Sequence, residues 1–369
     1  MLRFLTAGES HGPCLLAIIE GMPAGLPIDV EAINHELWRR QQGYGRSHRM
    51  NIEKDQVEIL GGVIKGETTG APIALRIENR DWLNWKEKWE QNRLEPLTVP
   101  RPGHADYAGM VKYRLKDARP ILERASARET AARVAVGAIA KQLLAQFDIT
   151  VGSYVCQIGP VIADIPPRPY AELWKLADAS EVRCPSPIDS ERMKSAIDEA
   201  RRARDTLGGI FEVQALNVPI GLGSHVHWDR RLDARIAAAI MSIQAIKGVE
   251  IGPAFENAGL RGTQVHDDLY LNEEQTIMRV TNRAGGIEGG MSNGNPIVVR
   301  AAMKPIATTG TPHQSVDVVN LHAATPAYQR SDICAVPAAS VIGEAMLAWV
   351  LAEALVEKLG GDSLEEMRR

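Results

Sequence analysis

Two histidines stand on short, turn-prone motifs from which an imidazole could reach a ligand. His11 lies in GESHG (8–12), directly after a strand-like opening segment, and His104 lies in RPGHAD (101–106), behind a Pro-Gly pair that favours a turn. Histidine changes its charge near neutral pH, so both residues are candidate acids or bases. A lone histidine is more often a hydrogen-bonded structural residue, and neither motif decides a function by itself.

Arginines gather in the segment RRQQGYGRSHRM (39–50). We expect Arg39 and Arg40 at the end of a helix, and Arg46 and Arg49 on the glycine-containing loop that follows. Their guanidinium groups suit carboxylates and phosphates, which they can bind through two parallel hydrogen bonds. The cluster therefore indicates an anionic ligand, although Arg39 and Arg40 could instead only complement the negative end of the helix dipole.

The segment ERASARET (123–130) has the pattern of a helix start. Ser126, followed three residues later by Glu129, forms a capping box, which predicts that a long helix begins here. A helix N-terminus also offers free amide groups to an anion, and Arg124 and Arg128 flank this one. The segment thus predicts a structural cap and, beside it, a candidate anion site.

A glycine-rich segment and the strand after it supply a third group of polar residues. In RAGGIEGGMSNGNPIVVRAAMKPIATT (283–309) the glycines allow a close backbone approach, but their spacing matches neither a dinucleotide fingerprint nor a P-loop. Lys304 could supply a positive charge to a phosphate, with Thr308 as a hydroxyl partner. Arg330 and Asp332 follow, although two such residues can also form a surface ion pair worth less than about 1 kcal/mol.

The elements that must position these residues include several helices. Three alanine-rich segments, at about 136–147, 232–243 and 341–355, repeat apolar residues with helical spacing and are expected to be core helices. A shorter helix is predicted from Asp29, its N-cap, to Arg40, and another begins near Asp189.

Strand-like stretches, most of them bounded by glycine or proline, separate these helices. They are found at residues 2–7, 56–64, 72–78, 152–161, 209–223 and 295–303. Strands and helices do not alternate regularly, so the order of elements favours an α+β fold over a doubly wound sheet.

Composition excludes several classes of protein. The formal net charge is -4, which argues against a surface that coats nucleic acid or an acidic membrane. The four cysteines are far apart and form no metal-type or redox-type pair, so we expect reduced thiols and no bound metal. No apolar run approaches the roughly 18–20 residues of a membrane span, and the N-terminus lacks the plan of a signal peptide. A cytoplasmic protein is expected.

Seven motifs together resemble the chorismate synthase family, in the family's order, from residue 7 to about residue 350. They are GESHG, GRSHRM, RPGHAD, SARETAARVA, GGIEGGMSNGNPI, MKPIAT and RSDICAVPAA. The resemblance implies a carbon-oxygen lyase of the shikimate pathway that makes chorismate from 5-enolpyruvylshikimate 3-phosphate. The reaction is an anti-1,4-elimination of phosphate that requires reduced FMN without net redox change. It also implies a homotetramer and a β-α-β sandwich, with alanine-rich helices between antiparallel sheets.

The resemblance assigns roles to five residues of the candidate site. His104 matches the acid that protonates the leaving phosphate, and His11 matches a histidine beside the flavin that assists its protonation. Ser10 and Ser126 match serines that form hydrogen bonds there. Asp332 matches an aspartate near flavin N5 that is implicated in removing the ring proton.

The resemblance also implies which residues bind the two ligands. The substrate carries two carboxylates and a phosphate, and its matched arginines are Arg40, Arg46, Arg49, Arg128 and Arg330. The matched flavin contacts are Arg124, Ala125, Ser126, Gln244, Ala245, Gly289, Lys304, Pro305, Ile306, Ala307, Thr308 and Arg330. Arg40 and Arg46 also match positions assigned to NADP. Many members carry serine in place of Ala125, so only a backbone contact is expected from that residue.

Matched residues occur along almost the whole chain, which predicts a single domain over residues 1–369. Some family members also reduce flavin with NADPH. Because this chain has no long insertion, we expect it to rely on an external reductant instead. The alternative of a nucleic-acid-binding module using the arginine loops is disfavoured by the net negative charge and the few aromatic residues.

Overall fold

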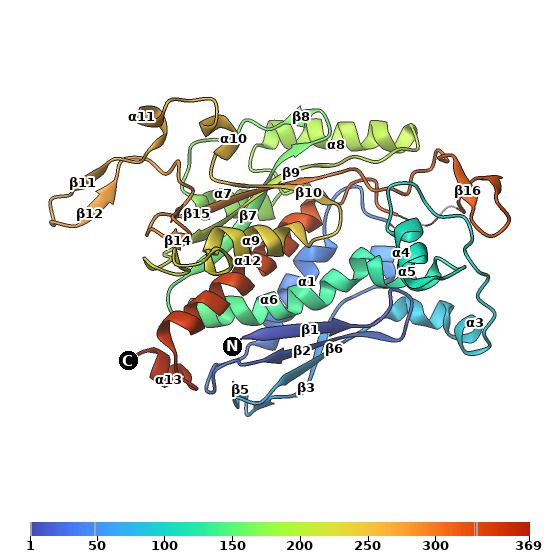
Figure 1. Cartoon of the computed structure of the whole chain (residues 1–369), viewed down its shortest axis with the longest axis horizontal. Coiled ribbons are helices and arrows are strands. Elements are labelled where there is room, and N and C mark those ends of the chain that lie inside the picture. The colour runs from blue at the N-terminus through green and yellow to red at the C-terminus, as the bar shows by residue number, and fades with distance from the viewer. Residues whose placement is uncertain (1, 48, 328, 330) are drawn as a thin grey trace.

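The computed structural model describes residues 2–47, 49–327, 329 and 331–369, and it places the main helices between two antiparallel sheets (Figure 1). The first sheet has the order β1 (Arg3–Ala7), β2 (Cys14–Glu20), β6 (Ile73–Glu78), β3 (Val57–Gly61). The second has the order β10 (Ile246–Ile251), β15 (Ile297–Met303), β9 (Gly209–Leu216), β7 (Thr150–Ile158), β8 (Val161–Ile162). The expected α+β sandwich is therefore confirmed.

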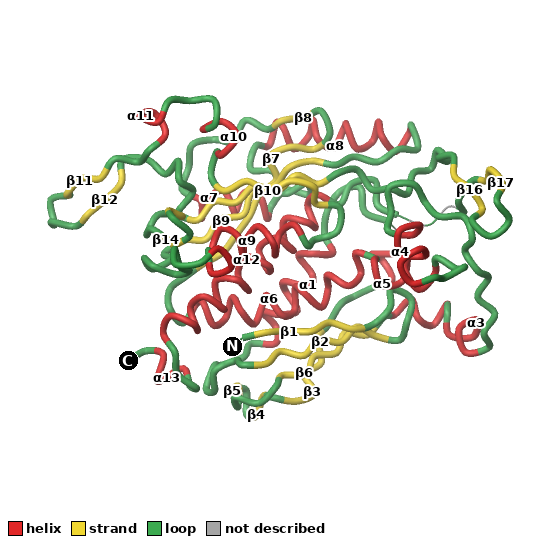
Figure 2. Tube along the Cα trace, in the orientation of Figure 1, coloured by secondary structure: helices red, strands yellow, loops and turns green. Residues whose placement is uncertain are grey.

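Four helices fill the layer between the sheets (Figure 2). They are α1 (Val30–Gln41), α6 (Thr130–Ala145), α9 (Leu232–Met241) and α12 (Val336–Leu359). Helix α12 packs along α6 and against β7 and β9, while α6 packs against β2 and β6. The helices α7 (Tyr170–Asp178) and α8 (Pro187–Arg202) contact the second sheet at β7 and β8.

Shorter elements lie in the connections. The short helices are α2 (Arg49–Ile52), η1 (Arg80–Asn84), α3 (Lys86–Glu90), α4 (Asp106–Tyr113), α5 (Arg119–Ala125), η2 (Ala127–Glu129), η3 (Trp228–Arg230), α10 (Ala254–Asn257), α11 (Gly262–Val265) and α13 (Leu364–Met367). Four small hairpins pair β4 (Val63–Ile64) with β5 (Glu67–Thr68), β11 (Leu269–Leu271) with β12 (Ile277–Arg279), β13 (Ile287–Glu288) with β14 (Met291–Ser292), and β16 (Ser315–Asp317) with β17 (His322–Ala324).

The helices predicted from periodicity and capping are confirmed. The Asp29 carboxylate accepts the N–H groups of Glu31 and Ala32 at 2.9 and 3.1 Å, as an N-cap does. The helix expected near Asp189 is α8, and the hydroxyl of Ser186 caps it by accepting the Asp189 N–H. Helix α12 is the longest of the described chain and begins before the predicted segment.

Every predicted strand segment contains a strand, but the predictions omit β2 and β10 of the two large sheets and most strands of the small hairpins. The stretch 209–223 leaves the sheet after Leu216, where Asn217 turns the chain with a φ of 59°. The stretch 56–64 is split into two strands by Gly62, whose φ of 82° favours glycine. Glycine and left-handed residues therefore end the strands earlier than their apolar pattern suggests.

Helix α12 is a core helix. It is long and apolar enough to span a membrane, but 89% of its most apolar window is buried inside the protein. Its buried residues join one hydrophobic core that extends from Leu2 to Met367 and includes both sheets.

Helices α6 and α12 approach each other so closely at Gly137 that no side chain fits there. A Cβ atom added to Gly137 would lie 2.3 Å from the Cβ of Ala345 and 2.5 Å from its Cα. Real carbon atoms do not approach so closely, so the helices would have to separate.

Replacing Gly137 by alanine is expected to lower the free energy of unfolding by about 1–3 kcal/mol through overpacking. This loss should appear even though alanine favours a helix over glycine by about 1 kcal/mol. Urea unfolding measures the change. Gly259→Ala serves as the control, because the nearest atom to a Cβ there is 3.5 Å away. Equal stability of wild type and Gly137→Ala would contradict the close packing.

Arg39 belongs to this core rather than to a ligand site. Its Nη1 donates to Glu344 Oε2 at 2.7 Å. Lys141 Nζ and Arg183 Nη2 reach the same carboxylate at 2.6 and 3.1 Å. The Glu344 side chain is fully buried, and Ser153 Oγ donates to it as well. Arg39 therefore helps to neutralise a carboxylate in the helical layer.

Candidate active site

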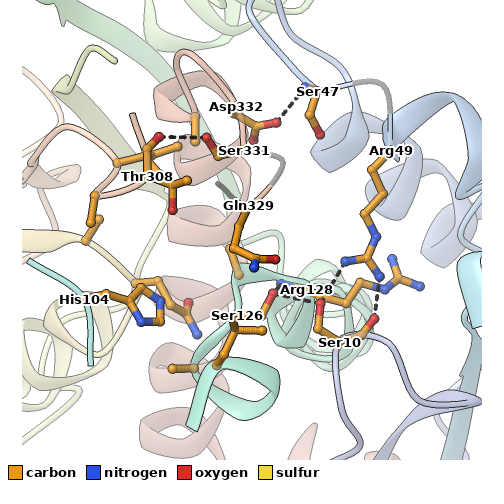
Figure 3. Close-up of a pocket in the computed structure, with 18 of the residues that line it drawn as sticks. Ser10, Ser47, Arg49, His104, Ser126, Arg128, Thr308, Gln329, Ser331 and Asp332 are labelled. Carbon is orange, nitrogen blue, oxygen red and sulfur yellow. Dashed lines mark hydrogen bonds between the residues drawn. The ribbon is translucent and has the colours of Figure 1, made fainter. Parts of the chain in front are cut away.

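A cavity of about 500 Å³ opens at one end of the helical layer. Its walls come from the turn after β1, the end of α1 and the loop behind it, the 101–105 turn, the α5–η2 junction, the 244–245 turn, and the segments that follow β15 and precede α12. Figure 3 shows His104, Ser126, Arg128, Ser10, Arg49 and Asp332 around this one space. Segments from most of the chain thus meet in one place.

Most of the predicted site residues line this cavity. They are Ser10, His11, Arg40, Arg46, Arg49, His104, Ala125, Ser126, Arg128, Gln244, Ala245, Lys304, Ile306, Ala307, Thr308 and Asp332. Both histidines are among them, so the two imidazoles share a cavity although 93 residues separate them in the chain (104 minus 11).

Four predicted residues are placed differently or not described. Pro305 does not line the cavity, although its neighbours on both sides do. Arg124 lies outside the lining and donates to the carbonyl of Thr6, two residues before GESHG, at 2.9 Å. Gly289 lies in the turn between β13 and β14, also outside the lining. Arg330 lies outside the described residues. A ligand role for these four stays a prediction.

His104 is held by a carboxylate that the sequence analysis did not assign. Its Nδ1 lies 2.5 Å from Asp106 Oδ1, and the Asp106 carboxylate is almost fully buried at the start of α4. Arg101 binds the other oxygen, Asp106 Oδ2, through Nε at 2.8 Å. Burial alone would raise the pKa of Asp106, but hydrogen bonds from His104 and Arg101 hold it well below its usual range. Asp106 is therefore ionised at neutral pH.

His11 has an equivalent partner, contributed by α5. Its Nδ1 lies 2.9 Å from Glu123 Oε1, and its backbone N–H donates to Glu123 Oε2 at 2.8 Å. The Glu123 side chain is also almost fully buried. The imidazole packs against Trp85, with 4.3 Å between ring centroids. One carboxylate thus fixes both the backbone and the ring of His11.

These partners differ in how visible they are in the sequence. Asp106 stands two residues after His104, so the motif RPGHAD contained a signal for it. Glu123 is 112 residues from His11, and no local pattern joins them. Trp85 is also far from His11 in the sequence, so its contact could be found only in the folded chain.

Three arginines on one wall of the cavity are held from behind by buried acidic residues. Arg128 donates to Asp55 Oδ1 at 2.6 Å, and Arg40 lies 3.4 Å from Asp55 Oδ2. Arg49 Nε lies 3.8 Å from Asp81 Oδ2. Because guanidinium groups so deeply placed need partners, these contacts explain how the chain keeps them at the cavity.

Arg40 remains cationic at neutral pH. Burial lowers the pKa of Arg40 to about 10, and Asp55 acts against that shift. Burial also lowers the pKa of Arg49, against the effect of Glu53. The wall therefore presents fixed positive charge to the cavity.

The two predicted serines form one hydrogen-bonded unit with Arg49 (Figure 3). Arg49 Nη1 donates to Ser10 Oγ at 2.8 Å, and Ser126 Oγ donates to Ser10 Oγ at 3.0 Å. These bonds join the GESHG turn and the α5–η2 junction to the start of α2, where Arg49 lies instead of on the predicted loop.

The predicted capping box is wrong for Glu129. Ser126 does act as a cap and accepts the Arg128 N–H at 3.2 Å, although it begins the short helix η2. The Glu129 carboxylate does not return to Ser126. It accepts from Thr6 Oγ1 at 2.7 Å and from Arg133 Nε at 2.9 Å, because the tertiary structure brings a hydroxyl and a guanidinium within its reach.

Gln244 presents a free acceptor at the cavity. Its Nε2 donates to the Glu129 carboxylate at 3.4 Å. Since the pKa of Glu129 is lowered, despite burial, by Arg133 and Thr6, that carboxylate only accepts and orients the amide. Gln244 Oε1 is buried and has no hydrogen-bond partner among the described residues. A ligand N–H group would satisfy it.

Lys304 and Thr308 connect the segment after β15 to the His104 turn. Lys304 Nζ donates to the Gly103 carbonyl at 2.5 Å, and Thr308 Oγ1 accepts from Arg101 Nη1 at 3.2 Å. The predicted phosphate-binding residues thus also support the turn that carries His104.

Asp332 closes the cavity on the side of the arginine loop. The backbone N–H of Ser47 donates to its Oδ1 at 2.7 Å, and Arg46 Nε lies 3.1 Å from its Oδ2. Ser331 next to it donates to the Thr308 carbonyl at 2.9 Å. A carboxylate, two imidazoles and several guanidinium groups therefore face one space, in which a small polyanion can be bound and protons can be moved.

Comparisons with known proteins agree with one family. The family model described as chorismate synthase matches residues 2–356. Chorismate synthase of Aquifex aeolicus is 57% identical over 381 residues, covering 100% of this chain and 96% of that protein. Chorismate synthase of Desulforudis audaxviator is 55% identical over 374 residues, covering 100% and 95%.

A solved structure agrees with these sequence relatives. A crystal structure of chorismate synthase has a TM-score of 0.81 and 50% sequence identity to this chain, and the match covers 100% of this chain and 95% of that one. Because the sequence identity is this high over the full length, this chain has the same fold and is the same type of enzyme as these proteins. The chain belongs to the chorismate synthase family and is a lyase.

Proposed function

We propose that this chain converts 5-enolpyruvylshikimate 3-phosphate to chorismate by anti-1,4-elimination of phosphate, with reduced FMN bound in the cavity and no net redox change. The observation that carries the proposal is the convergence of His11, His104 and Asp332 on one cavity walled by arginines, of which Arg40 and Arg128 are buried. This set of residues suits a small acidic substrate that must lose a proton and a phosphate.

The residues at the cavity fit a flavin. Gln244 Oε1 is a buried acceptor without a partner, which suits a ring N–H group. The residues that would hold the flavin include Ala125, Ser126, Ala245 and the stretch 304–308, apart from Pro305, which lies outside the lining. When bound, reduced FMN would supply an electron transiently to the substrate ring and recover it.

The arginines would bind the acidic groups of the substrate. Arg40, Arg46, Arg49 and Arg128 all line the cavity, and guanidinium groups suit carboxylates and phosphates. Because the buried carboxylates behind Arg40, Arg49 and Arg128 fix them in place, little reorganisation would be needed on binding.

Two side chains would move the protons of the elimination. His104 would donate a proton to the departing phosphate. The protonated phosphate is a better leaving group when the carbon-oxygen bond breaks. Asp332 would accept the proton from the ring carbon, which requires that substrate binding draw Arg46 away from its 3.1 Å contact with Asp332. The products would be chorismate and inorganic phosphate.

The direct test is phosphate release from 5-enolpyruvylshikimate 3-phosphate under strictly anaerobic conditions with dithionite-reduced FMN. We expect phosphate and chorismate in equal amounts. Equal turnover with oxidised FMN and no reductant, or no phosphate with reduced FMN, would contradict the proposal.

Further properties of the family are proposed for this chain. We infer a cytoplasmic homotetramer that takes reduced flavin from an external source in the shikimate pathway, with NADPH as the ultimate reductant. Steady NADPH oxidation by the pure protein with free FMN would instead indicate a reductase activity of its own.

We also infer that residues 1–369 form a single domain. The continuous hydrophobic core from Leu2 to Met367 supports this, as does a cavity built from segments throughout the chain. Independent folding of a fragment of residues 1–150 would contradict it.

A further inference from the structure

The two imidazoles of the cavity share one arrangement that the family resemblance did not include. Each ring contacts a buried carboxylate through Nδ1, at 2.5 Å for His104 with Asp106 and at 2.9 Å for His11 with Glu123. The other oxygen of each carboxylate accepts from a group that can only donate. This group is Arg101 Nε for Asp106 and the backbone N–H of His11 for Glu123. We propose that Asp106 and Glu123 are positioning residues that keep a proton on Nδ1 of His104 and His11, so that Nε2 of each ring takes up the proton it transfers by forming an imidazolium that the carboxylate stabilises. This inference rests on the proposed function.

The chemistry of the groups around His104 determines which nitrogen carries the proton. The Asp106 carboxylate only accepts hydrogen bonds, so the Nδ1 atom beside it must be the donor. Arg101 Nη2 lies 2.9 Å from His104 Nδ1, 3.3 Å from His104 Nε2 and 3.1 Å from Asp106 Oδ1. Its N–H groups cannot bond to a protonated Nδ1, so their partners are the carboxylate and, while Nε2 carries no proton, Nε2. Asp106 therefore also neutralises a positive charge that would otherwise face the ring.

An amide in place of Asp106 would reverse this assignment. Asp106 Oδ2 accepts from the backbone N–H of Arg101 at 3.1 Å and from its Nε at 2.8 Å, and neither group can act as an acceptor. In Asp106→Asn we expect the amide oxygen to stay at that position, where it meets two donors, and the NH2 group to take the place of Oδ1, where Arg101 Nη2 is the one donor it must displace. It then donates to His104 Nδ1, which makes Nε2 the protonated nitrogen of the neutral ring.

The same reasoning applies to Glu123. Its Oε2 accepts the backbone N–H of His11 at 2.8 Å, and a backbone amide can only donate. In Glu123→Gln the amide oxygen must therefore stay at the Oε2 position. The NH2 group then faces His11 Nδ1, and the tautomer of His11 should reverse as well.

The chain contains a matched control pair outside the cavity. His227 Nδ1 lies 2.6 Å from Asp229 Oδ1, with the same two-residue spacing as His104 and Asp106. Both side chains of this pair are more than half exposed, and neither lines the cavity. Asp229→Asn therefore removes the same kind of contact without touching the site.

The experiment records two-bond proton–nitrogen NMR spectra of the full-length protein labelled with ¹⁵N-histidine, with assignments from His104→Gln and His11→Gln. In the wild type, at a pH at which the rings are neutral, both should show the Nδ1–H pattern, a test that needs no carboxylate variant. Asp106→Asn should reverse His104 only, and Glu123→Gln should reverse His11 only. Anaerobic phosphate release should show kcat lowered about 10- to 100-fold in each variant, because an NH2 group facing Nδ1 opposes formation of the imidazolium, with KM changed less than about threefold.

Each result bears on one of the two proposals. Nε2–H patterns in the wild type, or wild-type kcat in both carboxylate variants, would overturn the positioning role. The Asp229→Asn variant should keep both the cavity tautomers and wild-type kcat. A wild-type protein that shows the expected tautomers but releases no phosphate would contradict the proposed function instead.

Discussion

Replacing His104 by alanine is expected to slow phosphate release by about 10²-fold or more, the loss that accompanies removal of a general acid. The imidazole lines the cavity and is oriented by Asp106 at 2.5 Å. Without it, the departing phosphate must leave without a proton from this position.

The effect should fall on turnover rather than on binding. The cations that would hold the substrate, Arg40, Arg49 and Arg128, have their own buried partners and do not depend on His104. KM should therefore change little while kcat falls. Single-turnover phosphate release under anaerobic conditions with reduced FMN measures the chemical step.

His227→Ala is the matched control for this measurement. It deletes a histidine of similar local pairing that lies outside the cavity, and we expect an unchanged rate. A near-normal rate for His104→Ala would show that His104 is not the acid, although the protein would still catalyse the reaction.

Replacing Glu344 by glutamine is expected to lower the free energy of unfolding by about 3–5 kcal/mol, the cost of removing one charged partner from a buried ion pair. Glu344 is fully buried and accepts from Arg39, Lys141 and Arg183. Glutamine keeps the shape but not the charge. Its NH2 group would also face donors, so three cations would lose their common acceptor within the helical layer.

Urea unfolding at fixed protein concentration measures this loss, with Glu353→Gln as the control. Glu353 lies on the same helix and pairs with Arg235 at 3.2 Å, but both side chains are partly exposed. A pair of that kind contributes about 0–1 kcal/mol. Similar losses of unfolding free energy in the two variants would show that burial does not increase the contribution of the Glu344 cluster to stability.

The difference between wild type and Glu344→Gln should depend on pH in a defined direction. Burial alone would raise the pKa of Glu344, but Arg39, Lys141 and Arg183 outweigh it and hold the pKa well below its ordinary value of 4.5. A carboxyl whose folded pKa is depressed adds stability that is present above its unfolded pKa and is lost as the pH falls toward the folded pKa. The difference should be largest near neutral pH and shrink below about pH 4.5. A difference that grows with acid would contradict this assignment.

Local features of the fold were predictable where one physical signal dominates. The helical repeat of apolar residues identified α6, α9 and α12, and the short polar side chain of Asp29 identified the start of α1. Strand β2 shows where such signals fail. Leu16 and Ile18 on its outer side are 39% and 43% exposed, so its sequence CLLAIIE does not alternate between apolar and polar residues.

The sequence by itself determined which chemical groups are present and which short segments carry them: two imidazoles on turns, an arginine-rich loop, and a helix start beside it. Only the tertiary structure decided what each group faces. Arg39 and Arg40 are neighbours in the chain, yet Arg39 points to Glu344 in the core and Arg40 to the cavity wall. The reason is that consecutive side chains on a helix point about 100° apart, so packing assigns them to different surroundings. His11 finds Glu123 across 112 residues for a related reason: burial of the helices brings together polar groups that no local pattern connects.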